Sequence, residues 1–382
     1  MIEHIVQKIK SCLPLNYRRL HIHEPNFDNE DINNVKNCTN STFVSTKGDY
    51  IDSFSQRLQK YTSCKYVLLT SSGSAALFLS LKTIDVKNCE VLLPSMTFVA
   101  TANSIVEAMG IPNFIDSSEN SLNISVSKLE QYLNKITIMK NNRCINKNTH
   151  KTIKALIIVH AYGEPANIAA IKKITKKYNI EIIEDGAGAL GSFYNNRHIG
   201  VTSRCSILSF NGNKIITTGM GGAILFSNKK DFMKMKHLIS TARVNHNWKV
   251  EHDQIGYNLR MANINAALGD GQMKRIKQTI RNKKILYNRY QAIFNDDEYC
   301  FLHESNPKGQ SNHWVTNLYL KNKYKKHHQA LIKKLHKEKI FVRELWKPQH
   351  MNIMYKTMPK SSLDNAIKHW KTGISLPSSY YQ

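Results

Sequence analysis

Acidic residues are scarce in this chain. Only 28 of its 382 residues are Asp or Glu, against 54 Lys and Arg, so the formal net charge is +26. Such a charge favours a polyanionic partner such as nucleic acid, but the sequence has no RGG tract, zinc-finger spacing or single basic tail. The basic residues form many short runs, mostly at helical spacing opposite apolar residues, as in "IKKITKKY" (171–178). We interpret most of the charge as a solvated surface, with nucleic-acid binding as a minor alternative.

Long apolar runs are absent as well. No stretch of about 18 apolar residues could cross a membrane, and the N-terminal 20 residues lack the apolar segment of a secretion signal. The seven cysteines are odd in number and scattered, without a CxxC pair. These absences predict a cytoplasmic protein with free thiols, no membrane span and no zinc site.

Short apolar runs alternate with helical segments over the first half of the chain. Runs bounded by turn residues predict buried strands at 65–70, 90–94, 112–116, 155–163 and 180–185. Helical spacing predicts helices at 75–83, 101–110 and 164–179. This order predicts parallel βαβ units and an α/β layer fold.

Three parts are predicted along the chain. Residues 1–50 are polar and loop-like and would form an N-terminal arm. Residues 51–255 would form a large domain with a mostly parallel central sheet, in which the basic segment 128–152 adds a helix and then a surface loop. Residues 256–382, with long helices before the alternating "HWVTNLYL" (313–320), would form a smaller α+β domain.

The segment "GAGALG" (186–191) matches the G-x-G-x-x-G dinucleotide fingerprint and follows a predicted strand. That strand ends in Glu184 and Asp185, which would place two carboxylates beside a pyrophosphate. The next residues resemble a polar hairpin and not a helix, and the first acid after Asp185 is Asp231, too far on for the ribose carboxylate. We therefore do not expect a nicotinamide cofactor.

Three other features are more informative together than each is alone. In "LLTSSGSAALFL", Ser74 and Ala75 would begin a helix after a glycine turn, where free N–H groups and the helix dipole favour an anion. Asp185 ends a buried strand, where α/β sheets place ligands. Lys214 follows another strand in the glycine-rich "SFNGNKIITTGMGG" (209–222). Singly, each has an ordinary explanation: a common turn, a turn cap and a surface lysine.

An anion cradle, a strand-end carboxylate and a glycine-flanked lysine are the parts that a pyridoxal phosphate site needs. The lysine, Lys214, would join the aldehyde covalently. The carboxylate, Asp185, would keep the pyridine nitrogen protonated, so that the ring can accept electrons from a substrate carbon. Phe98, just after the strand at 90–94, could cover the open ring face.

The sequence resembles the DegT/DnrJ/EryC1/StrS sugar aminotransferases, which have fold type I of the pyridoxal phosphate enzymes. The resemblance runs from "HEPNF" (23–27) to "LPSS" (376–379) and includes "TSSGSAAL", "LLPSMTFVATANSI", "VHAYGEPANIAAI", "IIEDGAGALGS", "SFNGNKIITTG" and "GYNLRMANINAALGDGQM". It implies a homodimer with shared sites, in which an Asn, here Asn258, reaches the phosphate of the neighbouring subunit. The cofactor-binding residues that it implies are Gly73, Ser74, Ala75, Phe98, Asp185, Ser209, Lys214 and Asn258.

Within the family, "FVSTKGDYIDSF", "FNGNKIITTG" and "VRELWKPQHMNIMY" resemble enzymes that aminate UDP-linked 4-keto sugars for legionaminic-acid-type or bacillosamine-type products. This resemblance implies transfer of an amino group from glutamate to a nucleotide-linked 4-keto-6-deoxy sugar. Arg343, Trp346 and His350 would lie near the sugar nucleotide, although packing of the small domain would explain them equally well.

Two positions depart from the family pattern. Gly188 stands where relatives usually have Gln or Glu, three residues after the carboxylate, and Met220 interrupts the glycine run. Relatives also usually continue past "LPSSYYQ" into a final helix. A sugar 3-dehydratase of the same family would have His in place of Lys214, so we disfavour that reading. A non-catalytic member that binds the cofactor or a nucleotide sugar remains an alternative.

Overall fold

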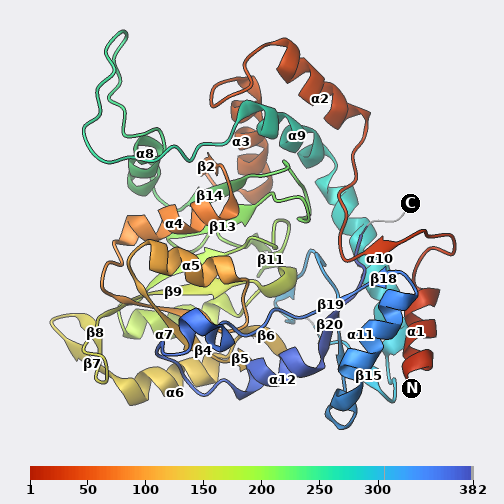
Figure 1. Ribbon diagram of the computed structural model, residues 1–382. Coiled ribbons are helices and arrows are strands. Elements are labelled where there is room, and N and C mark those ends of the chain that lie inside the picture. The colour runs from red at the N-terminus through yellow and green to blue at the C-terminus, as the bar shows by residue number, and fades with distance from the viewer. Residues whose placement is uncertain (305, 380–382) are drawn as a thin grey trace.

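The computed structural model describes residues 1–304 and 306–379. A seven-stranded sheet in the order β2-β14-β13-β10-β9-β3-β4 forms its centre (Figure 1). Only β14 runs antiparallel to its neighbours, and all other adjacent pairs are parallel. The predicted α/β fold is therefore confirmed. The strands of this sheet are β2 (Tyr66–Thr70), β3 (Glu90–Pro94), β4 (Ile111–Ile115), β9 (Ile153–Val159), β10 (Glu181–Asp185), β13 (Cys205–Ser209) and β14 (Gly222–Phe226).

Helices cover both faces of the sheet, because side chains alternate along a strand and nearly every position here is apolar. Ile157 and Ile183 pack towards one set of helices, and their neighbours Ile158 and Ile182 pack towards the other. The first set comprises α4 (Gly73–Ile84), α5 (Val99–Glu107) and α8 (Lys229–Leu238). The second comprises α6 (Val126–Ile136) and α7 (Ile168–Lys177), with α3 (Asp49–Thr62) and α9 (Asn263–Lys274) over β2, β14 and β13.

Four of the predicted strands agree with the structure to within about a residue at each end, but the strand expected at 155–163 is shorter. β9 ends at Val159, and Ala161–Gly163 forms a single 3₁₀ turn. In that turn Tyr162 has φ +54°, a left-handed conformation that is rare for a bulky side chain. The chain thus leaves the sheet at the point where the cavity described below begins.

The basic segment 128–152 also differs from the prediction of a surface loop. After α6 the chain forms a hairpin of β7 (Thr137–Lys140) and β8 (Arg143–Asn146). Asn141 and Asn142 make its turn with φ +48° and +58°, the conformation that two-residue hairpin loops require. The side chain of Cys144 is buried, so part of this segment belongs to the core.

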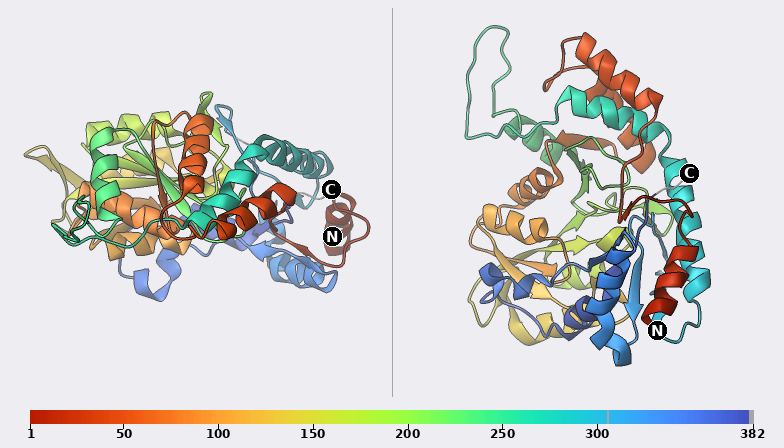
Figure 2. Two further views of the ribbon diagram at one scale, coloured as in Figure 1. Left: turned by 90° about the horizontal axis from the view of Figure 1, so that it is seen from above. Right: turned by 45° about the vertical axis from the view of Figure 1, so that its right-hand side comes forward.

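Residues 1–50 are not loop-like, which corrects the prediction for the N-terminal arm. They contain α1 (Ile2–Ser11), β1 (Leu20–His21) and α2 (Asn29–Asn40). Ile5, Val6 and Ile9 of α1 are fully buried in one cluster with C-terminal residues such as Leu335. Asp28 caps α2 in a reciprocal capping box with Asp31. Figure 2 shows α1 beside the C-terminal helices and α2 beside α9, at opposite ends of the molecule.

The C-terminal part carries its own four-stranded sheet in the order β15-β17-β20-β19. Long helix α10 (Ile276–Phe294) leads into it, and α11 (His328–Lys337) and α12 (Asp364–Thr372) follow. Its strands are β15 (Cys300–Phe301), β17 (Asn317–Leu320), β19 (Arg343–Glu344) and β20 (Gly373–Ser375). The short strands of the other small sheets, besides those given above, are β5 (Ser117–Ser118), β6 (Ser121–Ile124), β11 (Phe193–Tyr194), β12 (Arg197–His198), β16 (Gly309–Gln310) and β18 (Ile340–Phe341). Within residues 1–304 and 306–379, no helix is long and apolar enough to cross a membrane.

Candidate active site

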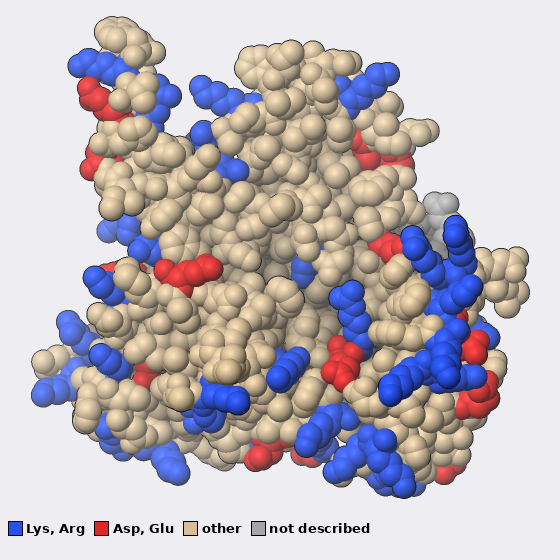
Figure 3. All heavy atoms as spheres, viewed as in Figure 1, with Lys and Arg blue, Asp and Glu red and all other residues tan. Residues whose placement is uncertain are grey.

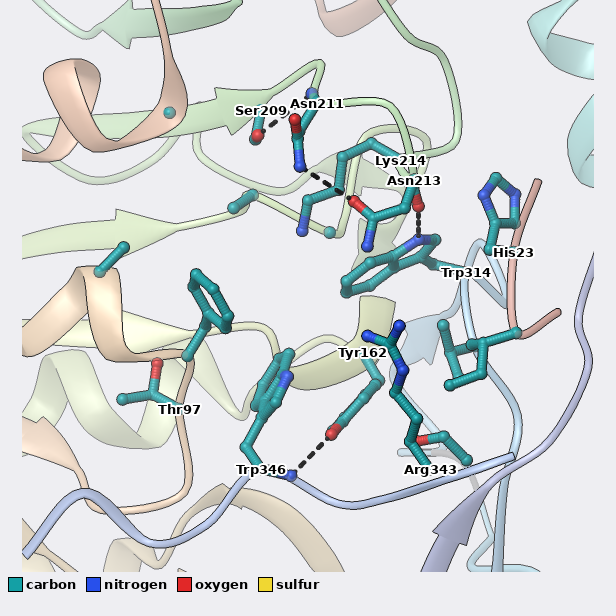
Figure 4. A pocket seen from close by; sticks show the side chains of 18 of the residues that line it. His23, Thr97, Tyr162, Ser209, Asn211, Asn213, Lys214, Trp314, Arg343 and Trp346 are labelled. Carbon is teal, nitrogen blue, oxygen red and sulfur yellow. Dashed lines mark hydrogen bonds between the residues drawn. The ribbon is translucent and has the colours of Figure 1, made fainter. Parts of the chain in front are cut away.

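A cavity of about 930 Å³ lies where the carboxyl ends of β9, β10 and β13 meet the C-terminal part of the chain. This is the edge at which parallel α/β sheets bind ligands, and the volume is in the range of small-molecule sites. Figure 3 shows the molecule hollowed near its centre, and Figure 4 shows the side chains that point into the cavity. The walls come from segments as far apart as His21 and Ser375.

Asp185 is the last residue of β10 and its carboxylate lines the cavity while remaining buried. Oδ2 accepts a hydrogen bond from Thr101 Oγ1 (2.7 Å), and Oδ1 accepts one from the N–H of Ala187 (3.0 Å). The hydroxyl of Thr101 lies 2.8 Å from that of Thr97. Both carboxylate oxygens are thus held in place and retain lone pairs for a ligand.

A buried His160–Glu184 pair lies next to Asp185 at the ends of β9 and β10. His160 Nδ1 accepts a hydrogen bond from the N–H of Ala166, so Nε2 carries the proton and donates to Glu184 Oε2 at 3.0 Å. Burial alone would raise the pKa of Glu184, but its hydrogen bonds with His160 and the N–H of Gly200 hold it below its ordinary value. This pair fixes the two strand ends that present Asp185.

Lys214 lies in the loop between β13 and β14 and extends into the same cavity (Figure 4). Its N–H donates to the carbonyl of Asn211, which closes the turn. Burial lowers the pKa of the ε-amino group to about 8, although the charge of Asp185 raises it. An amine with a pKa near neutrality is available as a nucleophile and as a proton carrier. The cavity therefore brings the two predicted catalytic residues together.

The predicted anion cradle is the N-terminus of α4. Ser72 caps the helix by accepting the N–H of Ala75 at 3.0 Å, so Ala75 has no free N–H to offer. Ala75 is also buried and does not line the cavity. Gly73 and Ser74 line the cavity and have the orphan N–H groups of a helix start. A Cβ at Gly73 would lie 2.8 Å from Cβ of Ser209. Glycine thus lets Ser209 approach the cradle.

An aromatic wall faces this cradle. Tyr162 and Trp346 stack with their ring centroids 4.0 Å apart, and the Tyr162 hydroxyl accepts the N–H of Trp346 at 3.0 Å. Phe98, 57% exposed, meets Trp346 edge to face at 6.4 Å. Both Phe98 and Trp346 line the cavity. The exposed ring of Phe98 is free to cover a planar ligand.

The other predicted residues fall in different places. Arg343 on β19 lines the cavity and is exposed. His350 does not line it, because Ser95 Oγ holds its Nδ1 at 2.7 Å behind the wall, where burial lowers its pKa. Asn258 is exposed, pairs by its backbone with Ser240 and lies outside this cavity. Met220 also lines the cavity with 63% of its surface exposed, and no contact in the structure explains a methionine there.

Of the lining residues that were not predicted from the sequence, four make contacts that bear on the predicted site. Thr101 holds the carboxylate of Asp185, and Tyr162 forms the aromatic wall. Trp314 lies beneath Lys214, and His23 comes from the N-terminal segment. Of these only Thr101 carried a local signal, since it lies three residues after Phe98 at the start of α5.

These residues fit pyridoxal phosphate. A buried carboxylate with oriented oxygens, a lysine of lowered pKa and a helix start that glycine keeps open lie around one cavity. The family model of the DegT/DnrJ/EryC1/StrS aminotransferases matches residues 25–380. The chain belongs to this family. It is an aminotransferase that uses pyridoxal phosphate, which supplies an aldehyde for the lysine and an electron-accepting ring.

Relatives of this aminotransferase include enzymes named for different amino sugars. It is 31% identical to EpsN of Bacillus subtilis over 95% of this chain and 91% of that protein. It is 30% identical to the GDP-perosamine synthase of Escherichia coli O157:H7 (94% and 92%) and 29% identical to a UDP-4-amino-4,6-dideoxy-N-acetyl-beta-L-altrosamine transaminase of Campylobacter jejuni (92% and 90%). Among solved structures, it is similar to PseC of Helicobacter pylori, an aminotransferase of pseudoaminic acid biosynthesis, with a TM-score of 0.85, 26% identity and 94% of each chain covered.

Proposed function

We propose that this aminotransferase transfers an amino group from glutamate to a UDP-linked 4-keto-6-deoxy sugar, for a surface polysaccharide or a nonulosonate sugar. The observation that carries the proposal is the cavity itself, in which Asp185 and Lys214 share a wall with the cradle at Gly73. The enzyme lies among relatives whose names include nucleotide-sugar transaminases. The resemblance to enzymes of UDP-linked sugars favours UDP over GDP.

The role of each residue follows from its position. Gly73, Ser74 and Ser209 would hold the cofactor phosphate, and Phe98 would cover its ring. The carboxylate of Asp185, oriented by Thr101, would pair with the protonated pyridine nitrogen.

Lys214 would provide the covalent link and then move protons. Once freed from the link, its amino group would take a proton from one carbon and deliver it to another, once while the donor is bound and once while the acceptor is bound. A pKa of about 8 suits this exchange because both protonation states are populated near neutral pH.

The sugar nucleotide would lie against the far wall. Arg343, His21 and His23 line that wall together with the ring of Trp346. The guanidinium of Arg343 and the N–H donors of the two histidines are complementary to a diphosphate. The +26 charge is consistent with anionic substrates at large. His350 would act indirectly, through the segment that it anchors to Ser95.

We also propose a homodimer in the cytoplasm. A loop before Asn258 exposes Trp248 (79%), Val250 (67%) and Ile255 (88%), and exposed apolar groups on a projecting loop are typical of an interface. Figure 1 shows this loop reaching away from the rest of the chain. Asn258, which lies outside the cavity of its own chain, would then reach the phosphate of the neighbouring subunit.

One experiment tests the catalytic proposal. The visible spectrum of the protein with pyridoxal phosphate is recorded for the wild type and for Lys214→Ala, before and after glutamate is added. We expect the wild type to lose the visible absorption band of the lysine-bound cofactor and to regain it when a UDP-linked 4-keto sugar is added. Lys214→Ala should bind the cofactor without turnover. A wild type that binds the cofactor but converts it with no amino donor would support a non-catalytic member instead.

The acceptor is tested separately. The glutamate-treated enzyme is offered UDP-linked and GDP-linked 4-keto-6-deoxy sugars, and the amino sugar is detected by mass spectrometry. A preference for the GDP sugar would contradict the nucleotide that we propose but not the reaction. If the protein bound a nucleic-acid column and free UDP-sugar did not elute it, the result would point to the alternative of a nucleic-acid binder.

A further inference from the structure

Trp314 lies beside the predicted catalytic lysine, although it comes from the loop before β17 (Figure 4). Its side chain is buried, with 5% of the residue exposed. Nε1–H donates to the carbonyl of Asn213 at 2.6 Å, and the backbone N–H donates to Asn312 Oδ1 at 2.9 Å. The indole is thus fixed both at its ring nitrogen and at its backbone.

Gly188 provides the space for this ring. A Cβ at position 188 would lie 2.3 Å from Cε3 and 2.7 Å from Cζ3 of Trp314, which is closer than any real contact of that kind. The carbonyl of Gly188 accepts a hydrogen bond from Asn312 Nδ2 at 2.9 Å, and so does the carbonyl of Leu190. Asn312 therefore ties the strand-end loop of β10 to the backbone of Trp314, and only glycine at position 188 permits that arrangement.

Lys214 lies over the face of this ring. Its Nζ is 3.7 Å from the Trp314 ring centroid, and tryptophan offers the strongest aromatic face for a cation. Tyr162 stacks with Trp314 at a centroid distance of 6.1 Å and an angle of 24°. The free ε-ammonium group therefore has a resting place inside the cavity that does not depend on an ion pair.

We propose that Trp314 is a positioning residue for Lys214, which holds the protonated ε-amino group over its face between the two proton transfers. This role of Trp314 rests on the proposed function, in which Lys214 transfers protons. When the ε-amino group takes a proton from carbon, a C–H bond breaks and an N–H bond forms, and the group becomes an ammonium. The indole face stabilises that ammonium close to the reacting atoms until the proton is returned.

Other titratable groups also lie around the cavity of Lys214. Asp185 on β10 favours the ammonium form, and burial in the cavity opposes it. Burial lowers the pKa of His23, from the N-terminal segment, and interactions with Lys283 of α10 and with Lys214 lower it further. Arg343 lines the same cavity. None of these groups lies on the loop of Trp314, so substitution of the indole leaves them in place.

The test measures the protonation of Lys214 in the cofactor-free protein. The pH dependence of labelling by acetic anhydride is followed by mass spectrometry on the peptide that contains Lys214, with the peptide of exposed Lys87 as an internal control. In Trp314→Leu we expect the pKa of Lys214 to fall by about 0.5 to 1, since a cation–π contact is lost. Trp314→Phe should give a smaller fall, and the Lys87 curve should not move.

An unchanged pKa, or a rise because water enters the cavity, would overturn the proposal. Gly188→Ala, which displaces the ring without removing it, keeps the test open where Trp314→Leu does not fold. In Gly188→Ala the pKa of Lys214 should fall as well. The double variant with Trp314→Leu should show no further fall, because both changes break the same contact between Lys214 and the ring.

With cofactor and substrates, we expect Trp314→Phe to lower kcat about 5- to 10-fold with little change in KM. Failure of the proposed function would give a different experimental result from failure of the Trp314 proposal. Reduction of the loaded wild type with borohydride would then attach the cofactor to a lysine other than Lys214, while the labelling result for Trp314 would stand unaltered.

Discussion

The hydroxyl of Thr101 donates a hydrogen bond to Oδ2 of Asp185 at 2.7 Å, so a residue of α5 orients the carboxylate at the end of β10. The N–H of Ala187 holds the other oxygen. The direction of the carboxylate is therefore set before any ligand arrives, which is the preorganisation that electrostatic catalysis requires.

Asp185→Asn should keep the fold and some cofactor but lower kcat with glutamate by about 100-fold or more, because a neutral amide cannot hold the pyridine nitrogen protonated. Thr101→Val, which removes only the orienting hydroxyl, should lower kcat by about 5- to 10-fold. Stopped-flow absorbance after mixing with glutamate measures both rates. Near-normal turnover in Asp185→Asn would show that the carboxylate does not contact that nitrogen.

Trp248→Glu should weaken the proposed homodimer, because it would place a charge in the apolar surface that we propose as its interface. Light scattering should then give a mass near 43.8 kDa, where the wild type gives about twice that value. Met139→Glu, on the exposed hairpin of β7 and β8, is the matched control and should remain dimeric. A wild type that is already monomeric would remove the basis for a shared site at Asn258.

Asp297 connects α1 to the end of α10. Its buried carboxylate accepts hydrogen bonds from Lys8, at 2.5 Å, and from the N–H groups of Tyr299 and Cys300. Burial alone would raise its pKa, but the hydrogen bonds with Lys8, the N–H of Tyr299 and His4 hold the pKa well below its ordinary value. Asp297→Asn should lower the free energy of unfolding by about 2 kcal/mol, since a charged acceptor is lost. Urea denaturation measures this, and Asp296→Asn, a change at the exposed neighbour, should have almost no effect.

Because the folded pKa of Asp297 is depressed, its contribution to stability is complete above the ordinary pKa of about 4 and is lost as the pH falls below it. The difference between wild type and Asp297→Asn should therefore shrink in acid. A difference that stays constant down to pH 3 would contradict the depressed pKa.

Lys283 is buried with 2% exposure and donates to the carbonyl of Ser378. Burial lowers its pKa to about 7 from an ordinary value near 10.5. Between these two values the unfolded chain binds one more proton than the folded chain, so the stability of the wild type relative to Lys283→Met should rise with pH, by up to about 1.4 kcal/mol per pH unit. Below pH 7 the difference should be flat.

Chemical denaturation at pH 6, 7.5 and 8.5 tests the Lys283 prediction. Lys284→Met, which replaces the exposed neighbour, is the control and should show no such slope. A difference between wild type and Lys283→Met that does not change with pH would mean that Lys283 is protonated in the folded protein throughout this range.

Much of the sheet could be predicted from the sequence because each strand is a short apolar run with its own boundaries. Asp185 ends such a run and Lys214 follows another, so the geometry of a parallel sheet brings both to one edge. Trp314 and His23 could not be found in this way. Their place in the cavity depends on how the C-terminal part and the N-terminal segment pack against the sheet, and no local pattern marks either residue.

The N-terminal helix α1 was missed for a different reason. Ile2, Ile5, Val6 and Ile9 have helical spacing, but the polar residues between them and the turn residues that follow led to the prediction of a loop. Its stability comes from packing on α10 and α11, which the local composition does not reveal.

His23 and Ser375 line the same cavity although nearly the whole chain separates them. A ribosome must therefore release almost all of the sequence before the cofactor site exists, and the sheet has to form its non-local pairings without help from the ligand. The vitamin-derived cofactor can stabilise only the finished molecule.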